Sequence, residues 1–349
     1  MKIRELNEDE VSKWDELVEN SDDSWLFHLH AWGELIDEVF GSTTYYLVAE
    51  DGNELIGVFP ITLRKKSCLK WFDSGSYGYG GFAFSPNLNE QQKKEASTLL
   101  LAYTRELAKR NDAAWLRIRL PPLAASQLPP KRPDSNPLIE YGFQDIPSYG
   151  FMVSLENPID SLWDNLGNKT RNIIRKAEKN GVEVLEADSR FSVDDYYALH
   201  LETCKRTGAA PFPKAYYESI AERFGKKGKQ HFFVARKGSN VLAALSVGSY
   251  KTGIHYWSGA SKSEALKLGC NDMLQWSAIK WAKENGYRWY DNGDVHPFSK
   301  NKKLQGIYRF KGSFGGALTK YYKGILVYSH LKKLIADIGK KVLGNGTEL

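Results

Sequence analysis

The stretch YYLVAEDGNELIGVFP, residues 45–60, decides the fold because the chain contains a second copy of it. That copy is HFFVARKGSNVLAALS, residues 231–246, and the two align without a gap. Val48 then matches Val234 and Gly52 matches Gly238, at a constant offset of 186 residues (234 − 48). Each copy predicts a β-hairpin, since two apolar strands flank a short turn that carries glycine.

A second pair of segments repeats after the hairpins. LAKRNDAAW, residues 107–115, matches WAKENGYRW, residues 281–289, at an offset of 174 residues (289 − 115). Apolar residues recur at helical spacing before each tryptophan, so each segment predicts the end of an amphipathic helix followed by a strand. Two helical segments also precede each hairpin. The same order of elements therefore occurs twice, which predicts two tandem α/β domains with mixed sheets flanked by helices, at 1–155 and 156–349.

Composition is that of a water-soluble protein of two domains. The 349 residues are 42% hydrophobic, enough for a substantial core. Acidic residues interrupt the start of the sequence, where a signal peptide needs an apolar run, and no window approaches the roughly 20 apolar residues of a membrane span. We therefore expect a cytoplasmic protein. The three cysteines form no CxxC pair and are expected to be reduced and buried, and no metal site is predicted.

Positive charge is unevenly distributed. The net charge is +6, and residues 295–336 contain no Asp or Glu but nine Lys and Arg. A second cluster lies in NKTRNIIRKAEKNG, residues 168–181, where Arg171 and Arg175 share one helical face. Such concentration favours a phosphate-bearing partner. The alternative is that both clusters are solvated faces without a ligand.

The order of elements resembles the acyl-CoA N-acyltransferase (GNAT) fold, and the tandem pair resembles the FemABX family of aminoacyl-tRNA-dependent peptidyltransferases. Four segments carry this resemblance: SYGYGGFAF (76–84), LWDNLGNKTRNIIRKAEKNGVEV (162–184), WAKENGYRWYDNGD (281–294) and GIYRFKGSFGG (306–316). The resemblance implies transfer of an aminoacyl group from aminoacyl-tRNA to an amine acceptor, such as a peptidoglycan precursor or a smaller amine. The first domain would hold the acceptor and the second would perform the transfer, with no cofactor.

Two departures from the family limit the acceptor. The long helical arm of some members is missing, and Ile36 stands where many members have a lysine that contacts a diphosphate. The donor has an alternative as well. GNAT members that use CoA cradle its pyrophosphate at a helix N-terminus, and here the corresponding segment EALKLGCNDML, residues 264–274, has Gly269 as its one glycine. A CoA-dependent N-acyltransferase of small amines or amino sugars, and a non-catalytic RNA- or anion-binding protein, are the two alternative functions.

The closing motif RFKGSFGG, residues 309–316, is the candidate catalytic segment. If it is a strand, alternation puts Arg309 and Lys311 on one face and Phe310 on the other. By resemblance Lys311 is the functional lysine of the family, with Phe310 beside it, and its ammonium would stabilise an oxyanion or bind phosphate. Arg309 would assist in substrate binding, and the glycine pair would allow close backbone approach or positive φ. The alternative is a packing strand with an exposed lysine.

Further candidates for substrate binding come from four other places. One is the pair of arginines on the basic helix, which would contact phosphate. A second is an arginine at the end of the helix predicted over 193–207, which would bind the acceptor, although helix capping explains its position about as well. A third is a tyrosine–glycine segment, equally consistent with a core strand and turn. The fourth is a strand end whose acids could act as general base or metal ligands, with a turn set by Asn292 and Gly293 as the alternative. The residues are Arg171, Arg175, Arg206, Tyr77, Tyr79, Gly80, Gly81, Asp291 and Asp294.

The segment HLKKLIADIGKKVLG, residues 330–344, predicts a basic amphipathic helix. We expect it to dock on the second domain, with weak peripheral contact to an anionic membrane as the alternative. The sequence does not define an oligomeric state.

Overall fold

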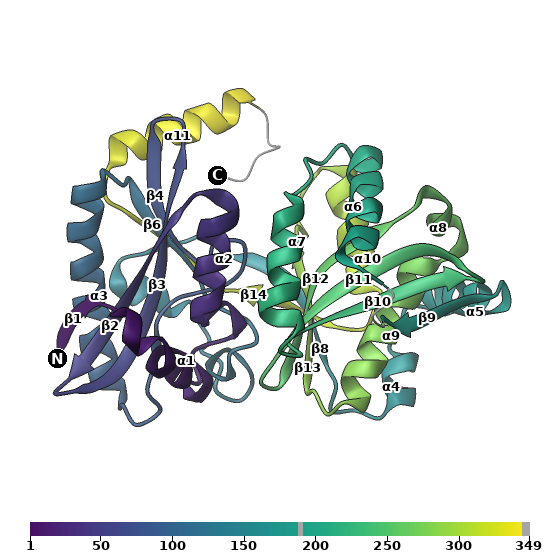
Figure 1. The fold of residues 1–349 in the computed structure, drawn as a ribbon, viewed down its shortest axis with the longest axis horizontal. Coiled ribbons are helices and arrows are strands. Elements are labelled where there is room, and N and C mark those ends of the chain that lie inside the picture. Colours follow the sequence, from purple (N-terminus) through teal and green to yellow (C-terminus); the bar gives the residue numbers. More distant parts are fainter. Residues whose placement is uncertain (188–190, 344–349) are drawn as a thin grey trace. The chain divides into compact units, whose positions relative to one another are not determined.

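The structure is a computed structural model that describes residues 1–187 and 191–343. It separates into two compact units, each built around one mixed β-sheet (Figure 1). Unit 1 comprises Met1–Pro147 and Tyr321–Leu349, and unit 2 comprises Ser148–Lys320. The tandem α/β architecture predicted from the repeats is confirmed.

Unit 1 has an eight-stranded sheet in the order β1-β2-β3-β4-β6-β15-β7, with β5 paired to β3. Its helix α3 packs on the sheet face that presents Leu47, Phe59 and Leu116. The elements are β1 (Lys2–Glu5), α1 (Val11–Asn20), α2 (His30–Phe40), β2 (Thr43–Asp51), β3 (Glu54–Lys66), β4 (Leu69–Ser74), β5 (Ala83–Phe84), α3 (Glu90–Asn111), β6 (Trp115–Arg119), β7 (Gln144–Asp145), β15 (Lys323–Val327) and α11 (His330–Leu343).

Unit 2 has a seven-stranded sheet in the order β14-β8-β13-β12-β11-β10-β9. Helices α5 and α9 share one hydrophobic core with this sheet, formed around Ile174, Leu274 and Ile254. The elements are β8 (Ser148–Ser154), α4 (Ile159–Asp164), α5 (Asn168–Lys179), β9 (Val182–Glu186), α6 (Val193–Thr207), α7 (Lys214–Ile220), β10 (Gln230–Lys237), β11 (Asn240–Tyr250), β12 (Gly253–Ser261), α8 (Ser263–Leu268), α9 (Cys270–Glu284), β13 (Trp289–Val295), α10 (Lys302–Gly312) and β14 (Ala317–Tyr321).

The two hairpins have the same register. Val48 lies opposite Val58 in unit 1, and Val234 lies opposite Ala244 in unit 2. Each hairpin also has one register shift at the matching place, after Ala49 and after Ala235. The internal repeat is therefore conserved in backbone geometry, down to the position of a β-bulge.

Each unit also contains one parallel pair of strands that soon diverges. In unit 2, β12 and β13 pair from Gly253–Trp289 to His255–Asp291. Beyond that point β12 continues on β11, while β13 continues on β8. Strands that part in this way leave a gap in the sheet at their carboxyl ends, where α/β folds commonly bind ligands.

The outer neighbour of each diverging strand comes from a distant part of the sequence. β15 pairs antiparallel with β6, and β8 pairs antiparallel with β13. Residues from Tyr321 onward therefore belong to unit 1, which differs from the expected division at 155. Helix α11 also packs on unit 1, where Ala336 is buried with Trp71 and Trp115, so the expected docking on the second domain is wrong. The last residue of that predicted helix, Gly344, lies outside the described residues.

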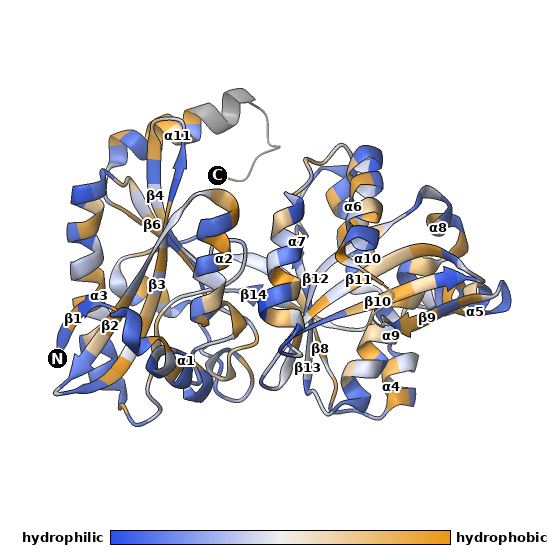
Figure 2. Cartoon of the chain, in the orientation of Figure 1, coloured by the Kyte–Doolittle hydropathy of each residue, from blue (hydrophilic) through white to orange (hydrophobic). Residues whose placement is uncertain are grey.

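The strand interiors are hydrophobic in both units, while most helices show a polar outer side (Figure 2). The span without acidic residues, 295–336, is divided between the two units at Lys320 and Tyr321. Its cations are therefore shared between the two units. Within the described residues, no helix is both long and apolar enough to cross a membrane.

Candidate functional site

The site begins at the last paired residues of β12 and β13. His255 Nδ1 lies 2.7 Å from Asp291 Oδ2, and both side chains are buried. The other oxygen of Asp291 accepts a hydrogen bond from the backbone N–H of Gly293 at 2.8 Å. Gly293 has φ +73°, a conformation that glycine adopts without strain. The turn that the sequence suggested for Asn292 and Gly293 is thus a kink within β13 at the point of divergence.

Lys311 reaches this point from a helix, which corrects the predicted strand. Residues 302–312 form α10, which begins after Asn301, whose side chain accepts hydrogen bonds from the N–H groups of Lys303 and Leu304. The alternating aromatic and basic residues therefore lie on a helix, where side chains two residues apart point to different sides. Arg309 is exposed while Lys311 is half-buried, so the two do not share a face as expected.

The ammonium group of Lys311 occupies the gap between the diverging strands. Its Nζ donates to the backbone oxygen of Asp294 at 3.1 Å and lies 5.2 Å from the centre of the Tyr256 ring. Burial lowers the pKa of Lys311, and the nearby carboxylates of Asp291 and Asp294 act in the opposite direction. An ammonium has three N–H donors, so a group held in this way can also donate to a substrate oxygen.

A buried amide pair fixes the position of the α10 backbone. Asn292 donates from Nδ2 to the backbone oxygen of Lys311 at 3.1 Å. Gln275 of α9 donates to the side-chain oxygen of Asn292 and, at 3.0 Å, to the hydroxyl of Tyr290. Because Gln275, Tyr290 and Asn292 are almost fully buried, this network holds the lysine helix against β13.

A cavity of about 110 Å³ lies beside Tyr256 of β12 and Phe310 of α10. Arg206 lines it and donates from Nη2 to Ser261 Oγ at 3.0 Å, and Phe310 and Tyr256 line it as well. Since Tyr256 also faces the ammonium of Lys311, the structure brings four predicted residues to one site with this tyrosine. They are Lys311, Phe310, Arg206 and Asp294, with Asp291 buried beneath them.

The basic helix α5 is tied to the end of α10. Gly167 donates its N–H to the backbone oxygen of Ser313 at 2.8 Å, and Thr170 Oγ1 bonds to Ser313 Oγ at 2.9 Å. Gly315, with φ +81°, and Gly316 allow the following chain to pass close to Asn165 and Met152, as expected for this pair. The helix that carries the phosphate-contact candidates is thus fixed relative to Lys311.

The two arginines of α5 differ in their surroundings. Arg171 is half-buried and donates to the backbone and side-chain oxygens of Asp164 at 3.0 and 3.2 Å. Arg175 is exposed, with its guanidinium 5.4 Å from the ring of Trp163. Arg175 is therefore the better placed of the two to meet a phosphate.

The N-terminus of α9 packs on one side against α5, while Asn271 of its first turn lines the cavity beside Phe310. A methyl group on Gly269 would lie 2.5 Å from a side-chain carbon of Ile173 and 3.6 Å from Ala177. Asp272 lies in the first turn of α9, and burial raises the pKa of its carboxyl to about 6. In GNAT members that use CoA this helix end binds pyrophosphate, but here it is packed against a helix and carries its own acid.

The tyrosine–glycine candidates lie in unit 1, whereas this set lies in unit 2. Tyr79 is buried, and Gly80 donates its N–H to the backbone oxygen of Arg119 at 2.7 Å. Gly81 donates to Ser74 Oγ at 2.9 Å. Tyr77 is half-buried and accepts from Arg64 at 2.7 Å. The segment fills the gap between β4 and β6, so the contacts of Tyr79, Gly80 and Gly81 are structural.

Comparison with known proteins agrees with this geometry. Residues 167–311 match the model of the acetyltransferase (GNAT) domain, and this range contains most of the site. The second unit is therefore similar to a GNAT domain over most of its length. No curated protein matches the chain.

Solved structures extend the GNAT fold to the whole chain. FemX superposes with a TM-score of 0.73 at 17% identity, covering 96% of this chain and 100% of its own. The C-terminal domain of a putative lysylphosphatidylglycerol synthetase from Agrobacterium fabrum gives 0.59 at 13% identity, with 97% of each chain covered. A tandem GNAT protein from the clavulanic acid biosynthesis pathway gives 0.55 at 13% identity, covering 93% and 98%. The tandem GNAT fold expected from the sequence is confirmed.

Sequence reasoning missed two functional candidates of this GNAT domain. His255 lies in a strand without any motif, and its carboxylate partner is 36 residues away. Gln275 lies on the buried side of α9, where a lone polar residue among Leu274, Ala278 and Ile279 was the available signal.

Cysteine chemistry is not supported at the GNAT site. Cys204 and Cys270 are buried as expected, whereas Cys68 is exposed. Cys204 Sγ lies 3.4 Å from His200 Nε2, yet burial raises the pKa of the thiol and lowers that of the imidazole. Both shifts disfavour the thiolate–imidazolium pair that a nucleophilic cysteine needs.

Proposed function

We propose that this protein transfers an aminoacyl group from aminoacyl-tRNA to an amine acceptor, such as a peptidoglycan precursor. The observation that carries the proposal is the position of Lys311, whose ammonium lies in the gap between β12 and β13. The amine nitrogen attacks the ester carbonyl, and the ammonium stabilises the oxyanion that forms. The bond to the ribose oxygen then breaks, an amide remains, and the proton of the amine ends on that oxygen.

The remaining residues position the reactants. Phe310 and Arg206 line the cavity beside the ammonium and would hold the acyl group, while the buried Asp291 keeps His255 in place beneath it. Asp294 fixes the lysine through its backbone oxygen. Holding amine and ester together in this way supplies most of the rate in a reaction without a covalent intermediate.

The tRNA donor is favoured over CoA by two features of unit 2. The helix end that would bind pyrophosphate is packed at Gly269 against α5 and carries Asp272 in its first turn. The exposed side of α5 instead presents Arg175, Lys176 and Lys179, which can follow a phosphate backbone. The name of the Agrobacterium fabrum neighbour is that of an enzyme that makes an aminoacylated lipid, and this agrees with an aminoacyl donor.

The test measures donor binding and transfer in the same preparation. Charged tRNA should bind with a salt-dependent affinity, and Arg175→Ala with Lys179→Ala should weaken binding and reduce the salt slope. Lys237→Ala, at an exposed lysine on β10, is the matched control and should leave both unchanged.

Three outcomes would contradict the proposal. Tight binding of acetyl-CoA with no binding of tRNA would establish the CoA-dependent alternative. RNA binding without transfer to any amine would indicate a binding protein instead. Undiminished transfer by Lys311→Ala would remove the assigned mechanism while leaving the donor assignment intact.

A further inference from the structure

Helix α11 exposes its apolar face. Leu331, Leu334, Ile335 and Ile338 follow the spacing of one helical face, and their exposed fractions are 69%, 57%, 59% and 52%. A docked helix normally buries such a stripe, because each large apolar side chain gains free energy when it leaves water. The stripe is therefore an unusual surface for a helix that already has a docking partner.

The opposite side of α11 makes the contact with unit 1. Ala336 is buried against Trp71 and Trp115. Lys333 lies 5.9 Å from the centre of the Trp115 ring and bonds to Asp337 at 2.6 Å. Lys332 pairs with Asp112 at the end of α3. The helix thus docks through its small and cationic residues and turns its leucines and isoleucines outward.

Cations surround this stripe. Three acids in the same region, Glu106, Asp112 and Asp337, are each already paired with a lysine. Outside these ion pairs, exposed cations lie on the last turns of α3 and on the β3–β4 hairpin, whose Leu69 packs against the Ala336 cluster. They are Lys65, Lys66, Arg105 and Arg110.

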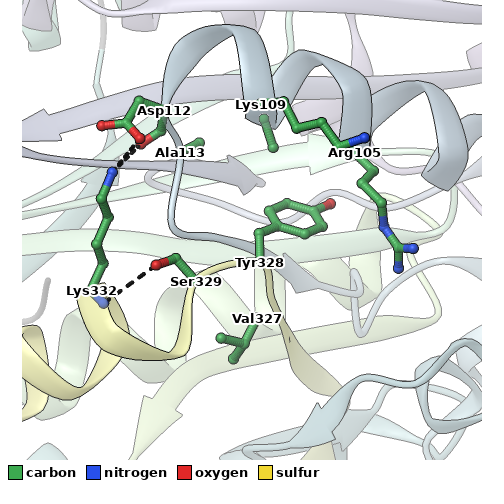
Figure 3. Close-up of a pocket in the computed structure, with 9 residues that line it drawn as sticks. Arg105, Lys109, Asp112, Ala113, Val327, Tyr328, Ser329 and Lys332 are labelled. Atoms are coloured by element: carbon green, nitrogen blue, oxygen red, sulfur yellow. Dashed lines mark hydrogen bonds and ion pairs between the residues drawn. The ribbon is translucent and has the colours of Figure 1, made fainter.

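A pocket of about 430 Å³ opens beside the first turn of α11 (Figure 3). Arg105 and Lys109 of α3 line it on one side, and Ser329 and Lys332 line it on the other. The ring of Tyr328 lies between them and its hydroxyl points toward Arg105 (Figure 3). That hydroxyl is buried, and no residue in 1–187 or 191–343 forms a hydrogen bond with it.

The pocket has the chemistry of a phosphate site. A phenol hydroxyl, a guanidinium and an ammonium are all donors that phosphate oxygens accept. Burial raises the pKa of the Tyr328 hydroxyl, although the charge of Arg105 acts against this, so the hydroxyl stays protonated and can donate.

We propose that α11 and this pocket form a docking surface for a lipid bilayer that contains anionic phospholipid. The stripe enters the boundary between headgroups and acyl chains, the surrounding cations face the headgroups, and the pocket takes one lipid phosphate. A second copy of the chain fits the surface poorly, since two-fold symmetry would place the same cations opposite one another. An anionic bilayer matches both the apolar stripe and its charge.

Sedimentation of the full chain with vesicles tests this proposal. The protein should bind vesicles of phosphatidylcholine with about 30% phosphatidylglycerol more tightly than phosphatidylcholine alone, by about tenfold or more. The double variant Leu334→Glu, Ile335→Glu should lose at least about tenfold in affinity. Leu266→Glu is the matched control, because Leu266 on α8 is 51% exposed and should leave binding unchanged.

Variants of the pocket separate a lipid phosphate from free phosphate. Arg105→Ala and Tyr328→Phe should each weaken binding to the anionic vesicles severalfold. Millimolar inorganic phosphate should not displace the wild-type protein from them. Failure to bind anionic vesicles would overturn the proposal, as would displacement by inorganic phosphate. A dimer that Leu334→Glu, Ile335→Glu converts to monomer, without any vesicle binding, would show that the stripe is an interface between copies.

Discussion

Both units have a mixed sheet in which a parallel pair of strands diverges, β4 and β6 in unit 1 and β12 and β13 in unit 2. The gap between the diverging strands is filled differently in each unit. In unit 1 the parallel strands β4 and β6 pair from Phe72–Leu116 to Ser74–Ile118. The glycine segment that follows β4 then returns into the gap and bonds through Gly80 to Arg119. In unit 2 the corresponding gap receives the side chain of Lys311 from α10. A gap closed by backbone is structural, whereas one closed by a single ammonium can bind a substrate.

The side-chain pairs that join the parallel strands next to the two gaps also differ between the units. Asp73 and Arg117 form a 2.6 Å ion pair in unit 1, at the place where unit 2 has His255 and Asp291. Burial acts to raise the pKa of Asp73, but Arg117, together with the charges of Arg119 and Arg64, outweighs it and the pKa is lowered. Unit 1 therefore has a buried ion pair, and unit 2 has a buried histidine in contact with a carboxylate.

Arg117→Ala should have the largest effect on stability. It leaves the buried carboxylate of Asp73 without its main partner, which costs about 3 kcal/mol or more. Thermal unfolding monitored by circular dichroism should show a transition several degrees lower, while the transfer rate of the folded protein is retained. A variant with normal stability and no activity would place chemistry in unit 1 and break the comparison.

Lys311→Ala should have the largest effect on activity. Removing the group that stabilises an oxyanion typically lowers kcat about 10²- to 10³-fold, and its partial burial makes the effect on stability small. Steady-state transfer assays measure this loss. Arg309→Ala, on the exposed side of the same helix, is the control and should stay within about twofold of the wild type.

Two glycine variants should separate structure from function. A methyl group on Gly80 would lie 2.5 Å from the backbone nitrogen of Gly75, so Gly80→Ala should cost about 2 kcal/mol of stability. On Gly293 the nearest atom would be Nζ of Lys311 at 3.1 Å. Gly293→Ala should therefore reduce kcat more than Gly80→Ala does. Equal kinetic effects would contradict the assignment of the two gaps.

The pH dependence should give the smallest effect. Because burial lowers the pKa of Lys311 below its ordinary 10.5, its ammonium is lost, and activity falls, at a pH below that value. Lys311→Arg keeps its charge throughout this range, so the alkaline decline in kcat/KM should move to higher pH in that variant. An unchanged alkaline limb would assign the titration to another group.

Local patterns predicted the fold well, and contacts distant in sequence did not. The hairpins around Val48 and Val234 were predictable because register and turn lie within 16 residues. The pairing of β15 with β6 was not predictable, because β6 lies about 200 residues earlier in the chain. Lys311 was a candidate from the sequence, but its helix was predicted as a strand because aromatic and basic residues alternate there. His255 was not predicted because its contact with Asp291 depends on the pairing of β12 with β13, which no local pattern indicates.

The insertion of unit 2 between two parts of unit 1 has a consequence for synthesis. All of residues 148–320 are translated before β15, so β6 keeps an open edge until the chain of unit 2 has been made. During that interval the nascent chain carries an unpaired strand that is able to join another chain. Completion of the sheet of unit 1 thus waits until the whole of unit 2 has been translated.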